Sequence, residues 1–165
     1  LGQEGHIDII PSKGFRLHQL TKKDVVETFQ VRSALETYCA MEITRAYTSR
    51  RAKRLFRELH FNMEEMKEIL ETTQSIQDFC TYDFQFHVEI VRYLENRQFS
   101  DIFDTFMYRM QRLALMSLSH PGRMEDTYRE HLAILETMEA GDTAHIYDIT
   151  LRHMDVPRGI NLEDL

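Results

Sequence analysis

Residues that interrupt helices are scarce over most of this chain. Of the six glycines and three prolines in 165 residues, three glycines and one proline lie within the first 20 positions. From Thr21 onward, apolar side chains recur at spacings of three and four, the period of a helix with one buried face. Hydrophobic residues make up 42% of the chain and charged residues 28%, which suits helices that pack against one another. The sequence therefore predicts a single all-α domain that is long enough to bury a substantial core.

Cap and breaker residues divide the helical part of the sequence into six segments. Thr21, followed by an acidic residue three positions later, has the spacing of a capping box, and Ser49 is a second N-cap. Pro157 is expected to break the last helix. The expected helices cover 22–46, 49–71, 75–94, 98–118, the stretch from after Pro121 to Gly141, and 143–154. Because the links between them are short, we expect an antiparallel bundle.

The first 20 residues have a different pattern. Ile7, Ile9 and Ile10 precede a Pro-Ser-Lys-Gly turn, and Phe15 and Leu17 follow it. This arrangement predicts two short strands joined by a turn. Because a hairpin of this size is marginal alone, we expect it to rest on the helical body or on another part of the protein.

Charge and cysteine content limit the classes of function. The formal net charge of -7 argues against a surface that wraps nucleic acid, since phosphate binding requires clustered cations. Cys39 and Cys80 each lie among apolar neighbours in a helical pattern, as free thiols do in a reducing compartment. No run approaches the ~18 apolar residues that cross a bilayer, and no signal peptide is evident. We therefore expect a cytoplasmic protein with no membrane partner.

Four potential metal ligands interrupt the apolar faces of three expected helices. Asp83 and His87 are four residues apart at the centre of the apolar face of 75–94. His131 lies in the apolar stripe of the fifth helix, and His153 in that of the sixth. A buried carboxylate requires a cation or several donors, and histidine is the commonest ligand of zinc, nickel and manganese. The pattern predicts a buried site for a divalent transition metal.

Other interpretations of these residues stay open on the sequence alone. A core histidine is more often a packed, hydrogen-bonded residue than a ligand, and Asp83 with His87 could form a simple charge-assisted hydrogen bond. In that case the chain is a purely structural bundle. If the last helix is misphased, His145 is the best substitute for His153.

Two arginines also fall on apolar faces. Arg32 lies on the buried face of the first helix and Arg109 on that of the fourth. Guanidinium groups match carboxylates, so either residue could contact a small organic acid beside the metal. The alternative is an internal ion pair with a glutamate such as Glu36 or Glu89, or an arginine that reaches solvent.

Ordered motifs in the chain resemble a known domain. They are Asp-Phe-Gln-Phe-His at 83–87, Glu-His-Leu-Ala-Ile-Leu at 130–135, Ala-Gly-Asp at 140–142 and Arg-His-Met at 152–154. This order resembles the FadR C-terminal domain, or FCD, of GntR-family transcription regulators. Val-Arg-Ser-Ala-Leu-Glu at 31–36 is similar to the opening helix of that domain. Six helices resemble its shorter, VanR-like branch.

The resemblance implies a domain organisation. Residues 1–20 are similar to the wing of the winged helix that precedes FCD domains, with a linker, so the recognition helix is expected outside this chain. The effector domain would span 21–156, and 157–165 would form a C-terminal tail. A homodimer that reads operator DNA is the implied assembly.

The resemblance also implies the roles of particular residues. The family's metal pattern is filled by Asp83, His87, His131 and His153. A small carboxylate effector is expected beside the metal, with Arg32 as a contact. Asn96, which stands where the family usually places an asparagine, and Arg109, which the helical pattern singled out, complete the expected effector contacts. The domain is then expected to sense a ligand and not to act as an enzyme. The alternative is a metal-dependent hydrolase or oxygenase that uses the same cluster.

Overall fold

The computed structural model describes residues 7–165, and positions 1–6 of the expected wing segment lie outside that range. Two strands, β1 (Ile7–Ile10) and β2 (Gly14–Leu17), are followed by six helices. The helices are α1 (Lys22–Arg45), α2 (Arg50–Glu71), α3 (Ile76–Arg92), α4 (Arg97–Leu118), α5 (Arg123–Glu139) and α6 (Ile146–Asp164). The prediction of an all-α bundle with a short hairpin is confirmed.

Local side-chain chemistry sets the helix starts. Thr21 and Asp24 form the expected capping box at α1, and Ser49 accepts a hydrogen bond from the Ala52 amide at α2. Asn96 caps α4, since its side chain accepts hydrogen bonds from two backbone amides of the first turn. These helix starts lie within two residues of the predicted ones.

The last helix is longer than expected. The prediction that Pro157 breaks it is wrong, because α6 continues through Pro157 to Asp164 and includes most of the expected tail. Proline removes only one hydrogen bond, to the carbonyl four residues earlier. Pro157 itself is buried, as are Met154 and Asn161 on either side of it. The packing of α6 along α1 therefore outweighs the local penalty.

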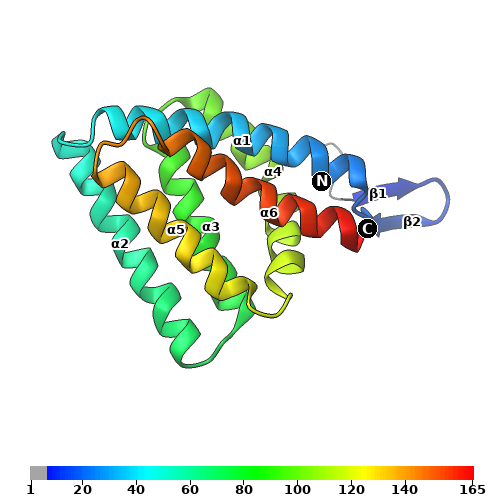
Figure 1. Ribbon diagram of the computed structural model, residues 1–165. Coiled ribbons are helices and arrows are strands. Elements are labelled where there is room, and N and C mark those ends of the chain that lie inside the picture. Colours follow the sequence, from blue (N-terminus) through cyan, green and yellow to red (C-terminus); the bar gives the residue numbers. More distant parts are fainter. Residues whose placement is uncertain (1–6) are drawn as a thin grey trace.

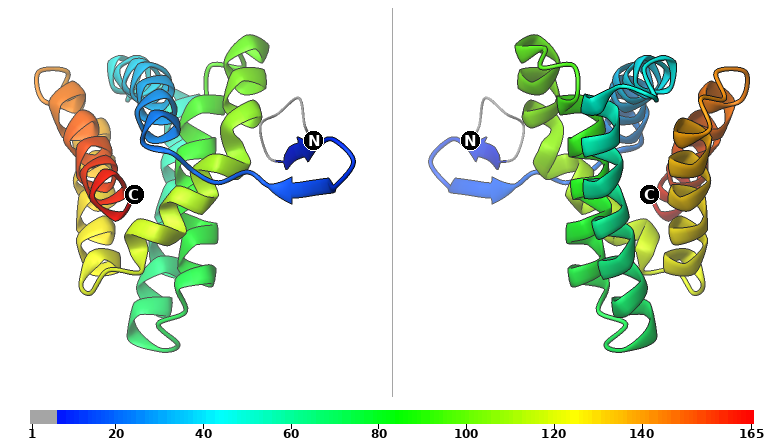
Figure 2. Two further views of the ribbon diagram at one scale, coloured as in Figure 1. Left: turned by 90° about the vertical axis from the view of Figure 1, so that its right-hand side faces the viewer. Right: turned by 90° about the vertical axis from the view of Figure 1, so that its left-hand side faces the viewer.

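The helices enclose one main core and two smaller clusters. The main cluster joins α2, α3 and α5 through residues such as Leu59, Phe79 and Leu135. In Figure 1, α1 and α6 run side by side in opposite directions, and the hairpin extends from the end of the bundle where α1 begins and α6 ends. Figure 2 shows the hairpin projecting away from the helices.

The hairpin pairs in the antiparallel register Ile7 with Leu17 and Ile10 with Gly14. Gly14 has a φ of 96°, which favours glycine in the turn. Ile9 and Phe15 are mostly exposed, at 66% and 76%. Within residues 7–165, no helix combines the length and the apolar character that a bilayer crossing requires.

Candidate metal centre

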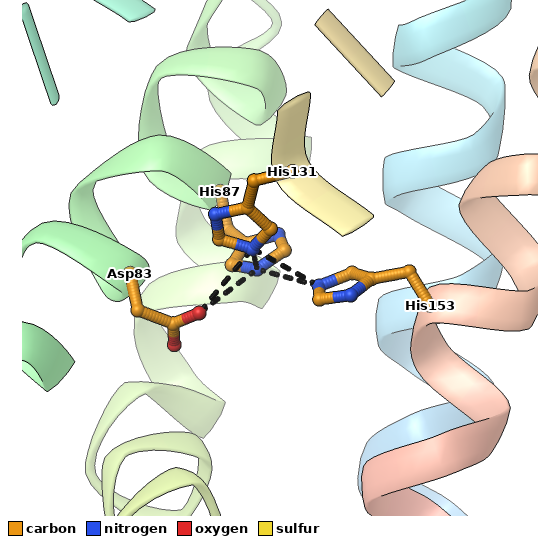
Figure 3. A group of neighbouring side chains, drawn as sticks. All are labelled: Asp83, His87, His131 and His153. Atoms are coloured by element: carbon orange, nitrogen blue, oxygen red, sulfur yellow. Dashed lines mark hydrogen bonds and ion pairs between the residues drawn. The ribbon is translucent and has the colours of Figure 1, made fainter. Parts of the chain in front are cut away.

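The four predicted ligands meet inside the bundle. Asp83 and His87 come from adjacent turns of α3, His131 from α5 and His153 from α6. All four are buried, and His131 is fully inaccessible to solvent. Figure 3 shows their side chains pointing toward one common point.

The distances define a compact ligand set. The three Nε2 atoms form a nearly equilateral triangle: 3.2 Å separates His131 from His87, 3.1 Å separates His131 from His153, and 3.2 Å separates His153 from His87. Oδ1 of Asp83 lies 3.3 Å from Nε2 of His131 and 3.8 Å from Nε2 of His87. One ligand atom from each residue falls within 4.8 Å of all the others.

Two glutamates orient two of the imidazoles from behind. Nδ1 of His153 donates to Oε2 of Glu130 at 2.6 Å. Nδ1 of His87 lies 2.6 Å from Oε2 of Glu36, within ion-pair distance but without the linear geometry of a hydrogen bond. Carboxylates behind ligating imidazoles fix the tautomer that leaves Nε2 free. His131 is held differently, because its ring stacks on Phe86 with centroids 4.2 Å apart.

The pKa values of the histidines and glutamates in the site favour the binding of a cation. Burial lowers the pKa of His131 well below its usual value, and burial also lowers the pKa of His153 despite the opposing Glu130 hydrogen bond. Burial alone would raise the pKa of Glu36, but Arg32 and His87 lower it to about 2. The hydrogen bonds from Arg123 and His153 likewise outweigh burial and lower the pKa of Glu130 to about 2.

This donor set fits a divalent transition metal. Because ionised glutamates lie against Nδ1 of His87 and His153, a ring in the neutral form that binds metals has its lone pair on Nε2, which points into the triangle. Converging lone pairs repel one another unless a cation lies between them. Metal–nitrogen bonds of about 2.1 Å would place tetrahedral ligand atoms about 3.4 Å apart and adjacent octahedral ones about 3.0 Å apart. The observed triangle lies between those two values.

A small cavity adjoins the ligand set. Its volume is about 20 Å³, which is room for an ion or a water-sized group. The polar lining combines ligands with arginine and hydroxyl side chains: Arg32, Asp83, His87, Ser117, Arg123, Thr127 and His153. The apolar lining consists of Phe29, Ala114, Leu118 and Pro157.

The predicted effector contacts are separated in the structure. Arg32 lines the cavity, and its Nε donates to Oε1 of Glu36 at 2.8 Å, the ion pair given as its alternative role. Arg109 lies 3.4 Å from Asp24 and outside the cavity lining. Asn96 caps α4, also outside that lining. His145 is exposed and hydrogen-bonded to Asp142, so it does not substitute for His153.

Sequence reasoning missed two residues of the site, Arg123 and Glu130. Arg123 lines the cavity and donates to both carboxylate oxygens of Glu130, at 2.6 and 2.7 Å. The available signal was their spacing of seven positions, which places them on one face of α5 next to His131. Glu36 was considered only as a partner for arginine, although it also contacts His87.

Comparison with known proteins identifies the family of this chain. The pattern of the FCD domain family matches residues 27–156. A curated relative from Paenarthrobacter nicotinovorans, named as a candidate transcriptional repressor of a D-xylose utilization operon, is 30% identical over 129 residues. Those residues are 78% of this chain and 54% of the relative, so the chain spans about half of that protein's length.

Several solved structures share the fold. A metal-free FCD domain aligns with a TM-score of 0.72 at 16% identity, over 88% of this chain and 96% of that one. A candidate GntR regulator from Rhodococcus sp. RHA1 aligns with a TM-score of 0.83 at 11% identity, over 100% and 76% of the two chains. At such identities the likeness concerns the fold alone. Because the family pattern covers most of the sequence, the protein belongs to the FCD domain family.

Proposed function

We propose that this chain is the ligand-sensing part of a GntR-family transcription regulator and that it binds a divalent metal and a small carboxylate. Asp83, His87, His131 and His153 would hold the metal, with zinc, nickel or manganese as the ions that suit these donors. The observation that carries the proposal is the buried triangle of three imidazole nitrogens, 3.1 to 3.2 Å apart. A bound ion supplies a positive charge that a carboxylate can coordinate.

The adjoining cavity supports a small ligand. Arg32 and Arg123 both line it, and both are at most 8% exposed. Guanidinium groups suit an organic acid, and the volume of about 20 Å³ requires local opening for anything beyond a few atoms. Of the predicted contacts, Arg32 has the position that this role requires. We therefore replace Arg109 and Asn96 by Arg123 in the proposed effector site.

Regulation would follow from the position of the site between helices. Residues of α1, α3, α4, α5 and α6 line the cavity, so an occupant changes how these helices pack. Such a shift would alter how a homodimer presents its DNA-binding regions to an operator. The transcriptional role named for the P. nicotinovorans relative supports this proposal.

A binding role accounts for the site better than hydrolysis or oxygenation. The two carboxylates nearest the imidazoles, Glu36 and Glu130, each hold an arginine and a histidine. Neither is free to act as a general base. We therefore propose no catalytic residue.

Calorimetry with metal-loaded protein tests the proposal. Titration with a panel of small carboxylates should give saturable binding by the wild type, and none by a His131→Ala variant carried through the same metal loading. A His145→Ala variant, altered at an exposed histidine outside the site, should behave as the wild type does. Absence of binding by the metal-loaded wild type across the panel would exclude the sensor role.

A further inference from the structure

Two of the predicted metal ligands are linked to arginines of the cavity lining by parallel chains of side chains. In one, Nε of Arg32 donates to Oε1 of Glu36, whose Oε2 lies 2.6 Å from Nδ1 of His87. In the other, Arg123 donates to Glu130, whose Oε2 accepts from Nδ1 of His153. We call these chains the Arg–Glu–His relays. Each begins at an arginine that lines the cavity and ends on a predicted metal ligand.

Each arginine retains hydrogen-bonding capacity toward an occupant of the cavity. Arg32 uses Nε for its glutamate, so its two terminal nitrogens are not taken by that bond. Arg123 has the reverse arrangement, because both terminal nitrogens bind Glu130 while Nε is buried with no hydrogen-bond partner among the described residues. A buried donor without a partner is costly. An acceptor in the cavity would satisfy it.

The charges around the cavity depend on the metal. Glu36, Glu130 and Asp83 contribute three negative charges, and Arg32 and Arg123 contribute two positive ones. Without metal, this buried group carries one net negative charge and repels an anion. A divalent cation changes the balance to one net positive charge, which a single carboxylate neutralises.

We propose that the two Arg–Glu–His relays couple the binding of a carboxylate at Arg32 and Arg123 to that of the metal. The inference rests on the proposed function and adds a mechanism to it. An arginine whose positive charge is partly neutralised by a bound anion attracts its glutamate less strongly. The glutamate then interacts more strongly with Nδ1–H of its histidine, through a hydrogen bond from His153 or the ion-pair contact with His87, and Nε2 becomes a better metal ligand. By linkage, the metal raises the affinity for the anion by the same factor.

The test measures zinc affinity at several acetate concentrations. Protein stripped with a chelator competes for zinc with a chromophoric chelator, and the same titration without protein corrects for zinc acetate complexes. Acetate should tighten zinc binding by a factor of roughly 5 to 100, the usual range for coupled sites. Zinc should tighten acetate binding by the same factor, measured by calorimetry.

Variants separate the relays from simple charge balance. Arg123→Gln with Glu130→Gln removes one relay but leaves the net charge unchanged, and it should reduce the coupling factor several-fold. Arg123→Lys retains the charge without the two-pronged contact and should show an intermediate factor. The matched control is Arg109→Gln, because Arg109 is a part-buried arginine that pairs with Asp24 outside the cavity. This variant should keep the coupling factor of the wild type. Circular dichroism verifies that each variant is folded.

The outcomes distinguish the two levels of the proposal. If zinc binds but acetate leaves its affinity unchanged, the coupling is wrong while the metal site stands. If coupling persists unchanged in the folded double variant and in Arg123→Lys, the relay through Glu130 is wrong. If zinc does not bind to the wild type, the proposed function fails, and the coupling fails with it.

Discussion

At the scale of single residues, Glu130 joins an arginine of the cavity lining to a ligand of the metal site. It accepts two hydrogen bonds from Arg123 and one from His153, and it directly precedes His131 in the sequence. Its side chain is 26% exposed, while those of Arg123 and His153 are each 5% exposed. One carboxylate therefore holds both a cavity-lining cation and a metal-binding imidazole in place.

Substitution of Glu130 tests this role without removing a ligand. Glu130→Gln keeps the shape of the side chain but loses the charge that orients His153, so the affinity for zinc should fall by roughly 10- to 100-fold. Glu139→Gln is the matched control, because Glu139 also contacts a histidine, His60, but at the surface. Competition with a chromophoric chelator measures both affinities. An affinity in Glu130→Gln equal to that of the control would contradict the assignment.

The four ligands could be predicted from sequence because each is a polar residue in an apolar helical stripe. Periodicity cannot show which polar residues lie behind them, since Glu130 is only half-buried and Arg123, although buried, is the first residue of α5, before its apolar stripe begins. Arg109 met the same criterion as Arg32, yet it faces Asp24 at the start of α1. A helical face specifies a direction but not the neighbour that lies there.

At the scale of elements, a histidine joins the hairpin to the bundle. Nδ1 of His18 lies 3.0 Å from Oδ1 of Asp8 in β1, and Nε2 lies 2.9 Å from Oδ2 of Asp24 in α1. The backbone carbonyl of His18 accepts from Nη1 of Arg112 in α4 at 2.7 Å. The connection between hairpin and helices is thus held from both α1 and α4.

This contact should depend on pH. Hydrogen bonds to Asp8 and then Asp24 raise the pKa of His18, and the His18 hydrogen bond lowers the pKa of Asp8. Because the folded-state pKa of His18 is raised, its contribution is complete below about 6.5 and is lost as pH rises through the folded value. On the acid side, the contribution of Asp8 is lost as pH falls below about 3.8.

Nuclear magnetic resonance can follow the His18 ring directly. Its titration should have a midpoint above 6.5 in the wild type and a lower midpoint in Asp8→Asn. Backbone amides of β1 should exchange faster with solvent once His18 loses its proton, after correction for the intrinsic pH dependence of exchange. A wild-type midpoint at or below 6.5 would show that the bridge does not form in solution.

Helix starts were more predictable than helix ends. Thr21 and Ser49 act through bonds to their own neighbours, so a local pattern identifies them. The end of α6 depends on packing against α1, which a rule for an isolated proline does not include.

At the scale of the whole molecule, a metal would cross-link helices that are distant in sequence. The ligands span residues 83 to 153 and come from α3, α5 and α6, while Glu36 adds α1 through His87. An ion that binds only the folded chain stabilises all of these contacts at once.

Unfolding by urea measures that stabilisation. At free zinc a hundred times above the dissociation constant, the free energy of unfolding should rise by about 2.7 kcal/mol relative to chelator-treated protein. In His87→Leu the two conditions should give nearly equal values, because a ligand is missing. A purely structural histidine cluster predicts the opposite pattern: zinc has no effect on the wild type, and His87→Leu is as stable as the wild type or more so.

Elemental analysis of the purified protein tests the central claim most directly. The wild type should contain close to one equivalent of transition metal per chain, and an Asp83→Ala, His153→Ala double variant should contain little. His145→Ala should match the wild type, since His145 is exposed and outside the site. If the wild type holds no metal after dialysis against zinc, nickel or manganese, the metal site and the sensor built on it are wrong.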